Sequence, residues 1–211
     1  MGDEPYAALL PWAAFAVVDR THGDPMWAGL AALVTALTLL ATSSRDVSRP
    51  YTNVIVLGGA VWFAGLAITG AVHPTNAGFL AHDGRAVSAA GFALIAFGSL
   101  AFRPAVEHYT RPHVRSSQWG DRSFRRVNVL ITLIWAATFT GISISHFVGA
   151  SMDRPETFTV FNWIVPIALA AIAAHRSRVC WENFNDDDRY EPDPMRDLAL
   201  DWEAPLHDSD R

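Results

Sequence analysis

The chain has 211 residues, of which 51% are hydrophobic and 18% are charged, and its formal net charge is −5. Every one of its 16 basic residues is an arginine. The charges cluster and leave long apolar stretches between them. This distribution argues against an ordinary water-soluble domain, because a chain this short cannot cover so many apolar helices with polar faces. The single cysteine, Cys180, cannot form an internal disulfide.

The apolar stretches predict helices that cross a membrane. A bilayer core of about 30 Å requires about 20 mostly apolar helical residues, and a charge near its centre is costly. We expect six spans, at about residues 6–18, 26–42, 54–72, 86–102, 127–150 and 158–175. The first is short and contains Pro11, so lying at the interface or re-entering the membrane stays open for it.

The arginines outside these spans predict the orientation. Short loops that are rich in arginine remain on the cytoplasmic side. With six spans and a cytoplasmic N-terminus, ten arginines fall inside, and only Arg20, Arg85 and Arg154 fall outside. We therefore expect an all-α, polytopic protein: a bundle of six transmembrane helices with both termini in the cytoplasm.

The most basic stretch, residues 102–128, lies between the fourth and fifth spans and contains six arginines and two histidines. We expect it to form a cytoplasmic loop, partly helical, that contacts membrane lipids or partner proteins. Arginines near an anionic surface contribute about 1 kcal/mol each, and aromatic rings favour the interface. The residues predicted to make these contacts are Arg111, Arg115, Trp119, Arg122, Arg125 and Arg126. No recognised nucleic-acid-binding module surrounds them, so we expect no nucleic-acid partner.

The C-terminal residues 181–211 carry eleven acidic residues and three arginines, whereas the first 180 residues have a net charge of +3. Such a polar, acidic segment is predicted to be disordered. Within the spans, glycines such as Gly58, Gly59, Gly65, Gly91 and Gly98 let helix backbones approach closely. Packing within the bundle and homodimerisation are both open interpretations of these glycines.

Few polar residues lie inside the spans, and these are the candidates for function. Asn128, His146 and Asn162 define a possible intramembrane polar path, and Pro166 is expected to disturb the helix beside Asn162. His73 and His146 are the candidates for a haem between two helices. No metal-ligand spacing supports such a group, so we expect neither a metal nor a cofactor.

The sequence resembles the intracellular septation protein A family of bacterial inner-membrane proteins over about residues 6–178. The similarity lies in "LLPWAAF", "GDPMWAGLAALVTAL" and "FGSLAFRPAVEHY", and in "RRVNVLITLIWAATF" with Asn128, Trp135 and Phe139. The longer arginine-rich loop and the acidic tail depart from the family. The resemblance implies an inner-membrane protein linked to envelope maintenance and cell division through protein partners, and it transfers no catalytic residues.

Nothing in the chain matches a nucleophile elbow, a phosphate loop or a paired-carboxylate site, so we do not expect an enzyme. We expect a non-enzymatic integral membrane protein that acts as a scaffold, or recruits partners, in envelope or septum maintenance. The alternatives are a small transporter or channel and, more remotely, the membrane subunit of a redox complex.

Overall fold

The structure is a computed structural model that describes residues 7–43, 54–72, 77–152 and 159–189. All regular structure in these residues is helical, which confirms the predicted all-α class for this part of the chain. The long helices are α2 (Leu10–His22), α3 (Pro25–Ser43), α4 (Val54–Val72), α5 (Ala77–Ser99), α7 (Arg122–Ala150) and α9 (Val165–Arg189). The shorter elements are α6 (Glu107–Thr110), the 3₁₀ turns η1 (Arg111–His113) and η2 (Ser116–Gly120), and the π-helical turn η3 (Val160–Ile164).

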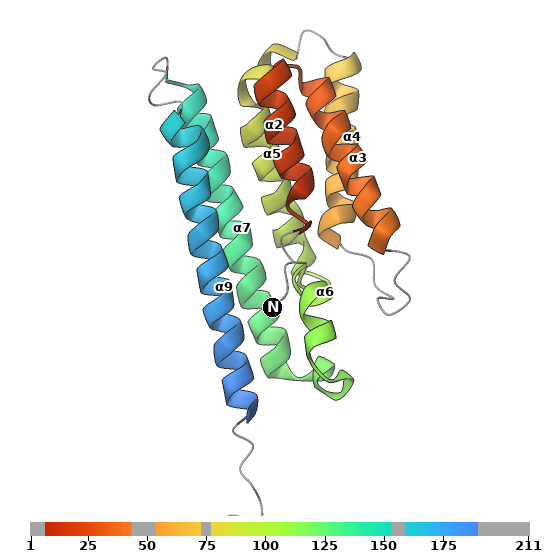
Figure 1. Cartoon of the computed structure of the whole chain (residues 1–211), viewed down its shortest axis with the longest axis vertical. Coiled ribbons are helices and arrows are strands. Elements are labelled where there is room, and N and C mark those ends of the chain that lie inside the picture. Colours follow the sequence, from red (N-terminus) through yellow and green to blue (C-terminus); the bar gives the residue numbers. More distant parts are fainter. Residues whose placement is uncertain (1–6, 44–53, 73–76, 153–158, 190–211) are drawn as a thin grey trace, which may run out of the picture.

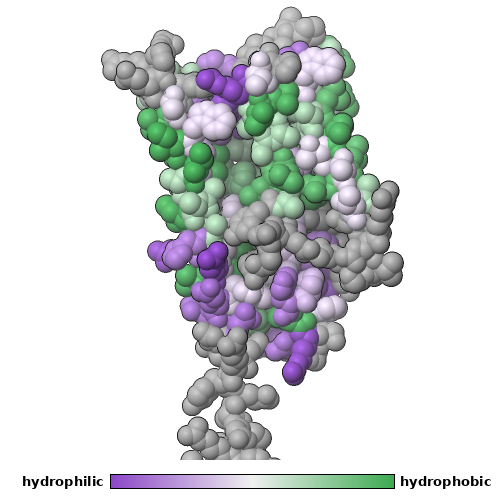
Figure 2. Space-filling model, in the orientation of Figure 1, coloured by the Kyte–Doolittle hydropathy of each residue, from purple (hydrophilic) through white to green (hydrophobic). Residues whose placement is uncertain are grey.

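The long helices alternate in direction along the chain (Figure 1). Helices α2, α3, α4 and α5 pack into one bundle, α7 packs against α5, and α9 packs against α7. Helices α7 and α9 project beyond the bundle at the end where α6 lies (Figure 1). Figure 2 shows hydrophobic side chains along the sides of the helices and hydrophilic side chains gathered at the α6 end.

Four segments in the described part of the chain are long and apolar enough to cross a membrane: Pro25–Thr42, Val54–Val72, Arg122–Ala150 and Val160–Asn185. They indicate a membrane protein. Helix α2 has only 13 residues, which corresponds to about 20 Å. Helix α5 is longer but carries Asp83 and Arg85. The six predicted spans are therefore confirmed only in part.

Helix α5 begins at Ala77, nine residues before the predicted span, and ends at Ser99. The charges at Asp83 and Arg85 led us to place these residues in a loop. The structure instead places Arg85 within the helix, where its guanidinium forms an ion pair with Asp19 of α2. A charged residue can continue an otherwise apolar helix when a neighbouring helix supplies its partner.

Helix α9 continues to Arg189, so the prediction that the disordered tail starts at residue 181 is wrong for residues 181–189. Trp181 and Phe184 are buried and pack with Phe124 at the start of α7. This burial of two aromatic rings stabilises the added turns. Residues 190–211 lie outside the described residues.

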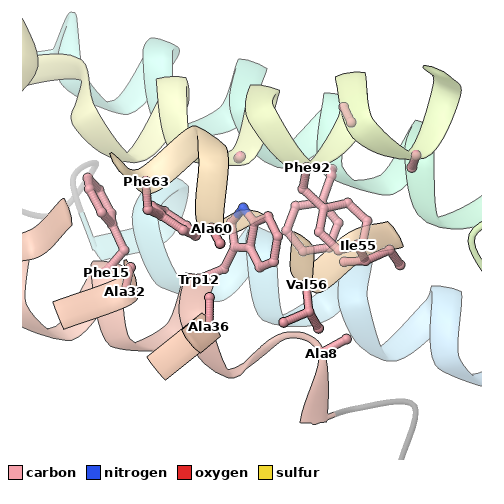
Figure 3. Packing of buried hydrophobic residues seen from close by; sticks show 14 of the residues in the cluster. Ala8, Trp12, Phe15, Ala32, Ala36, Ile55, Val56, Ala60, Phe63 and Phe92 are labelled. Carbon is pink, nitrogen blue, oxygen red and sulfur yellow. The ribbon is translucent and has the colours of Figure 1, made fainter. Parts of the chain in front are cut away.

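The centre of the bundle is an aromatic cluster around Trp12 (Figure 3). The ring of Trp12 lies edge-on to Phe63 and Phe92, with centroids 5.1 Å and 5.0 Å away, and Phe92 stacks on Phe139 of α7 at 3.9 Å. The indole Nε1 donates a hydrogen bond to the carbonyl of Ser88 at 3.0 Å, so this buried polar atom is satisfied. The short helix α2 is thereby fixed against α4 and α5.

Glycines allow helices α3 and α4 to approach closely. A Cβ atom at Gly29 would lie 2.9 Å from the backbone nitrogen of Ala67, and one at Gly70 would lie 3.0 Å from that of Met26. Gly58, Gly59 and Gly91 likewise contact side chains of neighbouring helices, so these three serve packing within the bundle. By contrast, Gly65 and Gly98 have no described atom within 4 Å of the corresponding position.

We predict that Gly29→Ala lowers the thermal unfolding midpoint in detergent. The added methyl group meets backbone atoms, which cannot rotate away, and overpacking of this kind costs about 1–3 kcal/mol. Gly65→Ala is the matched control, because its methyl group enters open space in an exposed helix position. Equal midpoints for the two variants would contradict the close approach of α3 and α4.

Candidate functional site

Polar residues gather at the two ends of the structure. The polar cluster, defined as Asp19, Arg85, His146 and Asn162, lies at the end opposite α6. The basic cap, defined as residues 100–126, lies at the α6 end and includes all five arginines predicted to contact lipids or partners. The two groups have different geometry and are described in turn.

The polar cluster contains a buried ion pair. Arg85 Nε donates to Asp19 Oδ2 at 2.8 Å, and the two side chains are only 10% and 8% exposed. The guanidinium carbon of Arg85 also lies 5.7 Å from the centre of the Trp163 ring, which favours a cation. No donor in the described part of the chain reaches Asp19 Oδ1. This pair connects α2 with α5 through charges that are almost completely removed from solvent.

A second polar contact in the cluster joins α7 to η3. His146 Nδ1 lies 2.9 Å from Asn162 Oδ1. Because an amide oxygen can only accept, Nδ1 is the donor of this hydrogen bond. One residue earlier, Ser145 Oγ donates to the carbonyl of Phe161 at 2.7 Å. Thus two of the three residues of the predicted polar path, His146 and Asn162, are brought together.

The π-helical turn explains the position of Asn162. Pro166 lacks a backbone N–H, and its ring crowds the carbonyl four residues earlier, which belongs to Asn162. The N–H of Val165 instead reaches the carbonyl of Val160, five residues back. Asn162 then packs against α7 at Gly149, where a Cβ atom would lie 2.6 Å from the amide nitrogen. The local irregularity expected at Pro166 is therefore present, and glycine on the facing helix makes room for it.

A cavity of about 330 Å³ adjoins the ion pair. Its polar lining comes from Asp19, Arg20, His82, Arg85 and Asn162, and Gly149 forms part of its wall. The pair from α2 and α5 and the amide from η3 therefore face one space. Irregular backbone at membrane depth is tolerated where it lines such a cavity.

The basic cap is folded against the bundle. Thr110 Oγ1 donates to Asn128 Oδ1 at 2.6 Å, and Asn128 Nδ2 donates to the carbonyl of Phe124 at 2.8 Å. Asn128 is 0% exposed, so these bonds satisfy both ends of its amide in the interior. This residue holds the cap to α7 and does not face the polar cluster.

The arginines of the basic cap have two different environments. Arg111 Nε donates to Glu107 Oε1 at 2.7 Å, and the Arg111 guanidinium carbon lies 4.8 Å from the centre of the Trp119 ring. The indole of Trp119 donates back to the carbonyl of Arg111 at 3.3 Å. Arg111 and Trp119 therefore hold the cap together. The exposed arginines are Arg103, whose Nε lies 3.7 Å from Glu107 Oε1, and Arg115, Arg122, Arg125 and Arg126.

An apolar layer separates the two ends. Asn128 and His146 are 18 residues apart on α7, which places them on the same face but about 27 Å apart along the axis. Between them, Phe139 stacks on Phe92, which in turn contacts Trp12. The structure therefore does not join Asn128 to His146 and Asn162. The other haem candidate, His73, lies outside the described residues, and the described residues contain no group of three or more possible metal ligands.

Comparisons with protein-family models, with curated proteins and with solved structures find no match to this chain. Its class is therefore taken from its own structure. The described residues are folded into helices alone, and four of these helices are long and apolar enough to cross a membrane. The ion pair was missed at the sequence level. The available signal was that Asp19 and Arg85 flank two predicted spans on the same side of the membrane.

We predict that Asp19→Asn and Arg85→Gln each destabilise the protein by about 3–5 kcal/mol, because each leaves an uncompensated buried charge. The double variant should lose less than the sum of the two, since it leaves no charge behind. Thermal or denaturant unfolding in detergent measures this double-mutant cycle. Additive losses would show that the two side chains do not stabilise one another.

Proposed function

We propose that the protein is a non-enzymatic, six-pass protein of the bacterial inner membrane. Its basic cap lies on the cytoplasmic leaflet, binds anionic lipid headgroups, and recruits partner proteins in envelope or septum maintenance. The observation that carries this proposal is the display of five exposed arginines on a folded segment at one end of an apolar helical bundle.

The start of α7 favours contact with anions. Arg122, Arg125 and Arg126 follow the i, i+3, i+4 spacing, so their side chains share one side of the helix. Its first turn has no acidic residue, and the side chain of Asp121 makes no capping hydrogen bond. Positive charges at the amino end of a helix oppose the helix dipole. Phosphate groups of a membrane surface would offset this repulsion.

The six-pass topology is supported by how α2 and α5 are placed. Both pack in the same bundle as α3 and α4, and the charges that disqualify α5 as a simple apolar span are paired with α2. Passage of all six long helices places the basic cap on the side where short arginine-rich loops remain. The role in envelope or septum maintenance rests on the resemblance of the sequence to the septation protein A family.

A small solute transporter is the second candidate, and the cavity beside the polar cluster favours it. A buried ionisable pair within a helical bundle is characteristic of solute pathways. However, the aromatic contacts of Trp12, Phe92 and Phe139 separate this cavity from the α6 end. The arrangement supports binding at one end more directly than passage through the bundle.

We predict opposite sidedness for the two ends of α7. In a Cys180→Ser background, Ser123→Cys should react with a membrane-impermeant maleimide only in inverted vesicles, and Ser151→Cys only in intact cells. The two substitutions are matched, since both replace an exposed serine. The reverse pattern would overturn the orientation, and labelling of both from one side would overturn the passage of α7 through the membrane.

We also predict that phosphatidylglycerol raises the unfolding midpoint of the detergent-purified protein more than phosphatidylcholine does. Replacing Arg115, Arg122, Arg125 and Arg126 together with Gln should abolish this difference, because each arginine near an anionic surface contributes about 1 kcal/mol. The matched control is the fourfold Arg→Lys variant, which keeps the charge and should retain most of the effect. A fourfold Gln variant that still responds to phosphatidylglycerol would rule out the basic cap as the lipid-binding surface.

A further inference from the structure

The cavity beside the polar cluster has no role in the proposed recruitment of lipids and partners, which uses the opposite end. Its lining brings together charged and polar groups from elements far apart in sequence. Asp19 and Arg20 come from α2, Arg85 comes from α5, and the neutral amide of Asn162 comes from η3. Its volume of about 330 Å³ is within the usual range for sites that hold small molecules. Burying an ion pair beside it is costly, which a purely structural contact between apolar helices would not require.

The chemistry of the lining selects the charge of the ligand. Among the described lining residues, the guanidinium groups of Arg20 and Arg85 outnumber the single carboxylate of Asp19. Asp19 already accepts from Arg85. Asn162 accepts from His146 through its oxygen, and its amide nitrogen faces the wall at Gly149. Donors and positive charge therefore predominate among these residues, and guanidinium groups bind planar carboxylates through paired hydrogen bonds.

The apolar residues of the lining indicate that the ligand also has an apolar part. Ala150 and Met152 contribute apolar surface on the α7 side of the same cavity. A ligand with a short hydrocarbon chain could bury that chain there while its charged group meets the arginines. We propose that this cavity is a binding site for a small carboxylate with a short apolar chain.

The test uses butyrate as the probe and the fluorescence of Trp163 as the reporter, since its ring lies against Arg85. The full chain, purified in mild detergent, should show a saturable fluorescence change with butyrate. Trp163→Phe should remove that change. Butyramide, which has the same shape without the charge, should bind about tenfold more weakly or worse, since a charge-assisted hydrogen bond is lost.

Two variants locate the site. Arg20→Gln should weaken butyrate binding by about tenfold, for the same reason. Because the Arg20 side chain is exposed, folding should be retained. Gly149→Ala should also weaken binding, because its methyl group displaces the Asn162 amide. Arg125→Gln removes the same charge at the opposite end and should bind butyrate like the unchanged protein.

Each outcome of these binding measurements either supports or overturns the proposed carboxylate site. Saturable binding of butyrate that is lost in Arg20→Gln and kept in Arg125→Gln supports the proposal. Absence of saturable binding overturns it, as does equal binding of butyramide, or an equal loss in Arg125→Gln. Because the lipid experiment concerns the basic cap, either proposal can fail without the other.

Discussion

The buried contact between Asp19 and Arg85 is the constraint on which much of the architecture depends. A charge inside an apolar bundle is tolerated only when a partner neutralises it. Arg85 lies in α5 and Asp19 in α2, so the pair joins these two helices. Helix α2 is too short for a simple apolar span, and α5 carries charged residues. Through this pair the first turns of α5 are joined to α2, and the cavity beside them takes part of its lining from both helices.

The aromatic cluster around Trp12 divides the structure into two chemically different halves. On one side lie a buried ion pair, an imidazole and an amide; on the other lies a folded cap with exposed arginines. Phe92 and Phe139 stack at 3.9 Å between them. Rings packed this closely separate the polar groups of the two ends. Each end therefore has its own chemical surroundings, and the helices α5 and α7, which pack against each other, extend towards both ends.

Helices α3 and α4 were predicted well from the sequence because they are defined by their hydropathy. Residues 54–72 form α4 as predicted, and α3 differs from its predicted span by one residue at each end, because hydropathy alone determines these helices. Helix α5 was misjudged because the partner of Arg85 lies 66 residues away in the chain. The end of α9 was misjudged because Trp181 and Phe184 are buried by tertiary contacts with α7. Local composition reveals neither the Asp19–Arg85 ion pair nor the tertiary contacts of Trp181 and Phe184.

The candidate residues show the same division between local and long-range information. A proline disrupts the hydrogen bonding of its own helix, one turn before it in the chain. The irregularity at Asn162 could therefore be predicted from Pro166 in the sequence. Asn128 has the same side chain in a similar apolar context, yet it bonds to Thr110 of the folded cap. The segment that packs opposite each asparagine decides which of the two stabilises the fold and which faces a cavity. At Asn128 that segment supplies a hydroxyl group that completes the amide's bonds; at Asn162 it supplies His146 and the bare backbone of Gly149, which leave the amide beside open volume.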